Sequence, residues 1–142
     1  MRILIAGGTG FIGKAMLREW AAHHTIEVLT RDPSKAQLPP NARAVGWDGK
    51  TLGAWTQHVE GADVLINLAG ETIAQRWSPE VKQRLWDSRV KTTELLVQAV
   101  QGAQSPPRVM LQASAIGIYD QNPETTCDED SPPATGFLAD LG

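Results

Sequence analysis

The sequence has little of several features on which other classes of protein depend. Its single cysteine, Cys127, excludes an internal disulfide, and no histidine cluster accompanies it, so we expect no metal site. Basic residues do not outnumber acidic ones, and a net charge of −3 argues against nucleic acid or an anionic membrane as the main partner. No apolar run approaches the roughly 18 residues of a membrane span. The short apolar start does not resemble a signal peptide, so we expect a cytoplasmic location.

Short apolar segments that are typical of buried strands recur along the 142 residues. Helical patterns are predicted between them: Ile12, Met16 and Trp20 lie four residues apart, and the pair Ser78–Pro79 is typical of a helix start, with the helix running to about Gln101. The alternation predicts one α/β domain, with a doubly wound, Rossmann-like parallel sheet that binds ligands at the carboxyl ends of its strands. The predicted strands cover residues 2–7, 24–33, 42–47, 62–70 and 108–119.

The stretch GGTGFIGKA, residues 7–15, contains two patterns of phosphate-binding loop. Gly8, Gly13 and Lys14 have the spacing of a nucleotide triphosphate P-loop, in which a Ser or Thr follows to hold magnesium. Here the following residue is Ala15, and no apolar strand ends in the acid expected as a second magnesium anchor. A P-loop NTPase therefore stays a remote alternative.

The dinucleotide-binding pattern fits the same stretch better, because the loop follows a strand and opens a helix. Gly7 allows the tight turn, Gly10 lets the backbone approach a pyrophosphate, and Gly13 lets the helix pack close to the sheet. The free N–H groups of the helix then face the phosphate charge. We expect Phe11 and Ile12 to be the first core-facing residues of this helix. The alternative is a glycine turn that serves packing alone.

The end of the second strand favours NADP over NAD. A site for NAD usually has an acid there, whereas this strand ends in Thr30 and Arg31, and a guanidinium can bind a 2′-phosphate through two parallel bonds. Lys35 adds a second positive charge nearby. Asp32 either repels the phosphate or caps the turn into Pro33. The alternative is that Arg31 is a solvated loop residue.

Several further motifs occur with these in a characteristic order: GGTGFIG (7–13), NLAGETI (67–73), RW (76–77), SRVKTTELL (88–96), SAIGIY (114–119), DEDSPP (128–133) and GFLADL (136–141). Together they resemble the atypical, epimerase-like branch of the extended short-chain dehydrogenase/reductase superfamily, often labelled NAD-dependent epimerase/dehydratase or sugar nucleotide epimerase-like. The resemblance covers almost the whole chain. It implies an NADP(H)-binding oxidoreductase or sugar-nucleotide-epimerase-like protein with an unidentified small-molecule substrate.

The resemblance also implies roles for individual residues. Arg89 matches the S-R-V position and is expected to point from its helix toward the cofactor, although a solvated helix charge beside Arg84 and Lys91 is the alternative from the residues alone. The other implied cofactor contacts are Thr9, Gly10, Phe11 and Ile12 along the pyrophosphate, Thr30 and Arg31 at the adenosine ribose, and the backbone of Leu68, Ala69 and Gly70.

The catalytic part of the pattern is incomplete. Hydride transfer in this superfamily pairs a Ser or Thr with Tyr-x-x-x-Lys, in which the lysine lowers the pKa of the tyrosine. The candidates are Ser114 and Tyr119, but the residue four after the tyrosine is Pro123, and Asp120 replaces the family's glycine. Ser114 either polarises a substrate or is a small residue needed for packing.

The family is about twice as long as this sequence. We therefore expect residues 1–142 to be the N-terminal part of a dinucleotide-binding domain, with the sheet incomplete at its C-terminus and the substrate domain absent. Such a chain is expected to be inactive alone, and either to associate with itself as a homo-oligomer or to be only marginally stable, because strand edges and apolar surface are uncovered. The alternative is a non-catalytic NADP(H)-binding or sensing module.

Overall fold

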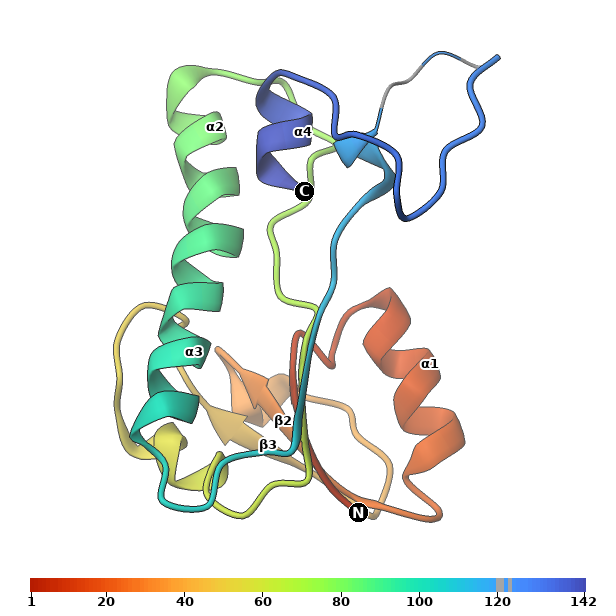
Figure 1. Cartoon of the computed structure of the whole chain (residues 1–142). Helices are drawn as coiled ribbons and strands as arrows, with labels where there is room; N and C mark the ends of the chain where they lie inside the picture. The colour runs from red at the N-terminus through yellow and green to blue at the C-terminus, as the bar shows by residue number, and fades with distance from the viewer. Residues whose placement is uncertain (120–121, 123) are drawn as a thin grey trace. The chain divides into compact units, whose positions relative to one another are not determined.

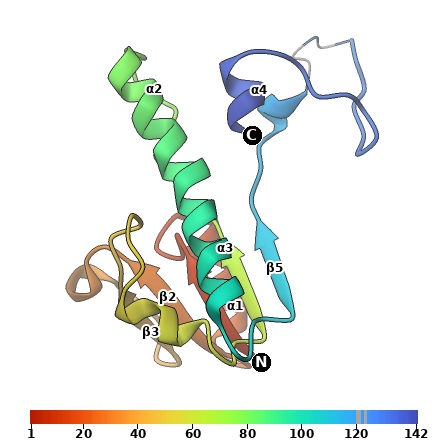
Figure 2. The same cartoon turned by 60° about the vertical axis from the view of Figure 1, so that its left-hand side comes forward.

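A computed structural model describes residues 1–119, 122 and 124–142, which form two units, Met1–Gln112 and Ala113–Gly142. The first unit contains a five-stranded, fully parallel sheet with the strand order β3-β2-β1-β4-β5 (Figures 1 and 2). This order confirms the predicted doubly wound, Rossmann-like sheet, because strand addition changes direction between β1 and β4. The strands are β1 (Arg2–Ala6), β2 (Thr25–Thr30), β3 (Ala42–Gly46), β4 (Val64–Asn67) and β5 (Val109–Gln112).

Helices cover both faces of this sheet. Helix α1 (Phe11–Trp20) follows β1, while α2 (Pro79–Trp86), the π turn η3 (Asp87–Lys91) and α3 (Thr92–Gly102) form one continuous helix (Figure 2). Its start is as predicted, since the Ser78 hydroxyl accepts a hydrogen bond from the Val81 N–H (3.3 Å) and Pro79 follows. The π turn was not predicted. Such turns are frequent at functional sites.

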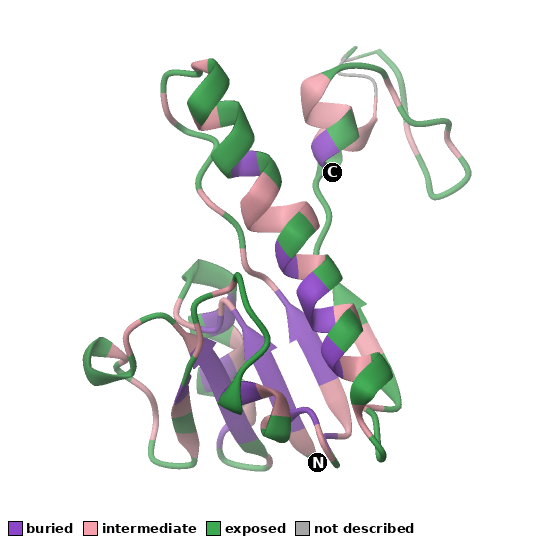
Figure 3. Cartoon of the chain, turned by 90° about the vertical axis from the view of Figure 1, so that its left-hand side faces the viewer, coloured by how far each residue is buried: buried purple, intermediate pink, exposed green. Residues whose placement is uncertain are grey.

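The alternation of residues along β1 divides the core between the two faces of the sheet. Leu4 and Ala6 lie in the cluster that includes α3, whereas Ile3 and Ile5 lie in the cluster that includes Leu17 of α1. Neighbouring strands continue the pattern, because a parallel register places like residues side by side. Figure 3 shows the resulting buried centre of the sheet and the buried stripe of α3.

The predicted face of α1 was wrong at its first residues, although Met16 and Trp20 are half-buried and pack against the core. The helix is buried at Gly13 and Leu17, and Ala21 just beyond it is also buried, whereas Phe11 is 94% exposed and Ile12 57% exposed. One residue along a helix is a rotation of about 100°. The error has a simple cause, since a glycine at a close helix contact contributes no apolar side chain to the pattern.

Two of the predicted helical crossovers are also wrong. Between β2 and β3 the structure has only the 3-10 turn η1 (Pro33–Lys35), and between β3 and β4 only η2 (Ala54–His58). Proline and glycine in these connections disfavour regular helix. The last two strands are shorter than predicted. Strand β4 covers only Val64–Asn67, and β5 ends at Gln112.

The second unit contains the 3-10 turn η4 (Ile116–Ile118) and the short helix α4 (Phe137–Leu141), which lies within the GFLADL motif. Asp120, where the sequence departs from the family pattern, and Pro123, four residues after Tyr119, lie outside the described residues. None of the helices described is long and apolar enough to cross a membrane.

Candidate functional site

The glycine loop after β1 lies against the segment that follows β4. Gly7 has a φ of +79°, and a Cβ atom on it would lie 2.6 Å from the carbonyl carbon of Leu68 and 2.8 Å from the nitrogen of Ala69. The Gly10 N–H donates to the Gly7 carbonyl oxygen (3.0 Å) and closes the turn. Only glycine satisfies both the conformation and the space at position 7.

The first turn of α1 packs closely on the loop where Gly13 meets Gly8. A Cβ atom on Gly13 would lie 2.5 Å from both the Cα and the carbonyl oxygen of Gly8. Gly8 in turn contacts the sheet, since its own Cβ would lie 2.9 Å from Cγ1 of Val28. The cofactor-loop pattern had not included Gly8, although the doubled glycine was a signal for it. The helix N-terminus, with no acidic residue in its first turn, is thereby held beside the loop with free N–H groups.

A buried asparagine organises the backbone after β4. Asn67 is completely buried, and its Oδ1 accepts a hydrogen bond from the Ala69 N–H (3.0 Å). Its Nδ2 donates to Oε1 of Gln112 (2.8 Å) and to Oγ1 of Thr93 (3.2 Å). The sequence analysis missed Asn67, yet it is the only polar residue in the run VLINLAG. These bonds fix the conformation of the segment that faces Gly7.

Arg89 lies on the π turn, and its guanidinium packs against the backbone after β4. A Cβ atom on Gly70 would lie 3.2 Å from the Cζ of Arg89. Nη1 donates to the carbonyl oxygen of Leu85 and to Oγ of Ser88, both at 3.4 Å. Burial lowers the pKa of the Arg89 guanidinium, and the charge of Glu71 acts in the opposite direction. The side chain is half-buried and is not a solvated helix charge.

At the end of β2, Arg31 is exposed and makes no hydrogen bond or ion pair with any residue that the structure describes. Asp32 is not directed at it. Its carboxylate pairs with Lys35 (2.8 Å) and accepts a hydrogen bond from Ser34 (2.5 Å), and these contacts lower the pKa of Asp32. Lys35 is therefore engaged with Asp32. The carbonyl of Thr30 accepts a hydrogen bond from the Trp47 N–H (3.1 Å), which ties the strand end to the residue after β3.

The first unit thus gathers the predicted cofactor residues at the carboxyl edge of its sheet, around the change of direction between β1 and β4. Ser114 and Tyr119 belong to the second unit. Ser114 is exposed, and its hydroxyl donates a hydrogen bond to the carbonyl oxygen of Gly142 (2.8 Å). Tyr119 is half-buried, and its backbone N–H donates a hydrogen bond to the carbonyl oxygen of Ile116 (3.1 Å). Among the residues described, no group of three His, Cys, Asp or Glu side chains is placed to hold a metal ion.

Comparisons with known proteins agree on one family. The model of the "NAD dependent epimerase/dehydratase family" matches residues 3–137. The chain is 35% identical over 145 residues to the chloroplastic SDR39U1 homolog of Arabidopsis thaliana, covering 99% of this chain and 42% of that protein. It is 35% identical to epimerase family protein YfhF of Bacillus subtilis, covering 92% and 43%. The crystal structure of human SDR39U1 (isoform 2) with NADPH matches with a TM-score of 0.77 at 29% identity, over 99% of this chain and 46% of that one. The chain spans less than half the length of these relatives.

Proposed function

Because the chain belongs to the NAD dependent epimerase/dehydratase family, we propose that residues 1–142 supply the NADP(H)-binding part of an oxidoreductase or sugar-nucleotide-epimerase-like enzyme. The observation that carries this proposal is the glycine cradle. Gly7 is held at positive φ against the backbone after β4, and Gly13 brings the first turn of α1 onto the same loop. The NADPH in the human SDR39U1 structure supports the choice of cofactor.

The residues present fit a dinucleotide. Exposed backbone from Gly10 to Ile12 at the start of α1 would hold the pyrophosphate, and Arg31 would hold the 2′-phosphate with an otherwise unpaired guanidinium. Leu68 to Gly70 would line the cofactor through the backbone, with the guanidinium of Arg89 beside Gly70. A bound nicotinamide cofactor supplies a hydride donor or acceptor. The chain's own residues bind and orient it.

The proposal makes a prediction about cofactor choice. We expect wild type to bind NADPH roughly ten- to hundredfold more tightly than NADH, because a charge-assisted bond to the 2′-phosphate is available only to NADPH. Arg31→Ala should remove most of this preference and leave NADH affinity nearly unchanged. Fluorescence titration of both cofactors at fixed ionic strength measures the effect.

Arg18→Ala is the matched control, since it removes another exposed cation, at the last turn of α1. It should preserve the preference. Equal affinities in wild type, or an Arg31→Ala variant that loses both cofactors alike, would mean that Arg31 shapes the loop and does not bind the phosphate.

A second candidate, a non-catalytic NADP(H)-binding or sensing module, is favoured by one observation. Tyr119 is the only tyrosine, and no lysine stands four residues after it. We expect residues 1–142 to show no oxidation of NADPH with carbonyl compounds or sugar nucleotides, since losing a positioned acid–base group costs about two to four orders of magnitude in rate. Robust oxidation that disappears in Tyr119→Phe would contradict this and identify Tyr119 as the acid.

A further inference from the structure

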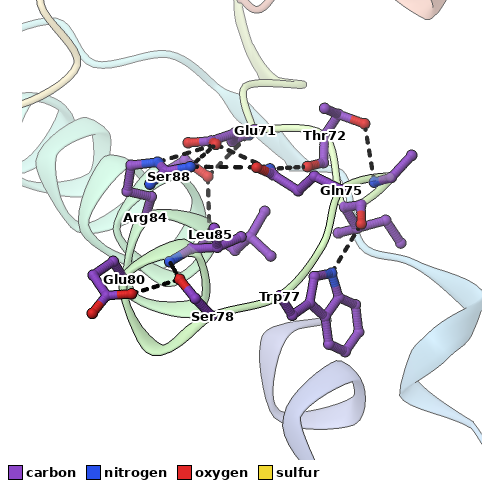
Figure 4. A network of polar contacts seen from close by, with 12 residues as sticks. Glu71, Thr72, Gln75, Trp77, Ser78, Glu80, Arg84, Leu85 and Ser88 are labelled. Atoms are coloured by element: carbon purple, nitrogen blue, oxygen red, sulfur yellow. Dashed lines mark hydrogen bonds and ion pairs between the residues drawn. The ribbon is translucent and has the colours of Figure 1, made fainter.

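Glu71 stands next to the proposed cofactor site and holds a negative charge there. Its carboxylate Oε1 accepts hydrogen bonds from Nε2 of Gln75 (3.0 Å) and Nε of Arg84 (3.2 Å), as Figure 4 shows. These two bonds hold the pKa of Glu71 below its ordinary value. The guanidinium of Arg84 also donates from Nη2 to Oε1 of Gln75 (3.3 Å). The carboxylate is therefore ionised and directed at the helix α2.

The same segment brings Glu71 close to Arg89. The Oγ atom of Ser88 accepts hydrogen bonds from the Glu71 N–H (2.9 Å) and from Nη1 of Arg89 (3.4 Å), so both residues share one anchor. The charge of Glu71 acts electrostatically on Arg89, yet no ion pair joins the two. Among the described residues, Arg89 has only its two long bonds to Leu85 and Ser88, which leaves most of its five donors unused.

A half-buried guanidinium beside a carboxylate normally forms an ion pair, because burial makes an unpaired charge costly. Here Oε1 of the Glu71 carboxylate is engaged by Arg84 and Gln75 instead, and the charge of Glu71 also acts on Arg31. The consequence is a positive charge that stays available behind Gly70, where the proposed function places a cofactor carrying two or more phosphate charges.

We propose that Arg84 is a positioning residue for cofactor binding: it engages the carboxylate of Glu71 and so keeps the guanidinium of Arg89 free for the dinucleotide. The inference rests on the proposed function, because it assumes that a dinucleotide binds beside Arg89. Arg84 itself does not touch the cofactor. Its effect is transmitted through Glu71.

The test is a double-mutant cycle measured by titration with NADPH and with NADH. Arg84→Met should weaken both cofactors about five- to tenfold, because the released carboxylate pairs with Arg89 and competes with the phosphates. Glu71→Gln should bind both at least as tightly as wild type. Glu71→Gln/Arg84→Met should recover to within about twofold of wild type, since no carboxylate remains to be released.

A purely structural tie between the loop and α2 makes the opposite prediction, in which Glu71→Gln weakens binding and the double variant is no better than Arg84→Met. That result, or an Arg84→Met variant with wild-type affinity, would overturn the inference. So would a loss confined to NADPH, which would assign the effect to Arg31. The control Lys91→Met removes another exposed ion pair of the same continuous helix, with Asp87 (2.8 Å), and should bind like wild type. A wild-type protein that binds neither cofactor would overturn the proposed function, and the inference with it.

Discussion

Gly13→Ala is expected to abolish detectable NADP(H) binding and to lower the free energy of unfolding by about 1–3 kcal/mol. The new methyl group would overlap the backbone of Gly8 at 2.5 Å, and backbone cannot rotate away as a side chain can. The first turn of α1 must therefore move off the loop, which takes its free N–H groups away from the pyrophosphate position. Cofactor titration and urea unfolding monitored by tryptophan fluorescence measure the two effects.

Gly102→Ala is the matched control for this variant. Apart from its chain neighbours and the backbone of its own helix, no described residue has an atom within 4 Å of a Cβ built on Gly102, and the residue ends α3 far from the glycine loop in sequence. The control should keep wild-type affinity, and its free energy of unfolding should lie within about 0.5 kcal/mol of the wild-type value. A Gly13→Ala protein that binds NADPH normally would contradict the proposed place of the cofactor.

Glu27→Gln is expected to lower the free energy of unfolding at neutral pH by about 2–3 kcal/mol. Glu27 lies in β2 with its side chain completely buried, and it pairs with Arg2 of β1 (3.0 Å), Arg43 of β3 and His58 of η2 (2.9 Å). Removing the carboxylate charge leaves the guanidinium groups of Arg2 and Arg43 without their counter-ion. The expected loss is below that of a fully enclosed pair, because Arg43 is 65% exposed and water can solvate it.

The effect has a defined pH dependence. Burial alone would raise the pKa of Glu27, but hydrogen bonds from Arg43, His58 and Arg2 together hold it below the ordinary 4.5. The contribution of this carboxylate to stability is therefore complete above about pH 4.5 and is lost as the pH falls through the lower pKa of the folded state. The difference between wild type and Glu27→Gln should shrink from pH 7 to acid pH.

Urea unfolding at several pH values measures this difference. Glu19→Gln, which alters an exposed acid on α1, is the matched control and should change stability little at any pH. A Glu27→Gln protein as stable as wild type at neutral pH would show that the carboxylate and the two guanidinium groups of Arg2 and Arg43 only compensate one another's burial.

Much of the framework was predictable because it depends on neighbours in the sequence. Apolar runs closed by glycine or polar residues predicted the five strands along the chain, and the pair Ser78–Pro79 predicted the start of the long helix. The glycine spacing, together with the place of the loop between a strand and a helix, predicted a dinucleotide-binding loop. The first residues of the buried face of α1 were predicted wrongly, because Gly13 packs closely by lacking a side chain.

The polar contacts could not be predicted in this way. Glu27 is surrounded by side chains of residues 2, 43 and 58, which meet it only because three parallel strands and a 3-10 turn are brought side by side. A single acidic residue in an apolar run looks the same in the sequence whether it is buried or exposed. Asn67, likewise, finds Gln112 only through the register of β4 and β5.

The sequence by itself therefore determined the fold class, the family pattern and the position of the loop expected to hold phosphate, since these are encoded by local hydrophobic periodicity and glycine spacing. The tertiary structure alone decided which charges are satisfied: Glu27 is paired and buried, Glu71 is engaged by Arg84, and Arg89 is left half-buried beside Gly70. The physical reason is that a charge interacts over a few ångströms of space, and the parallel sheet brings residues within that distance that lie tens of positions apart in the chain.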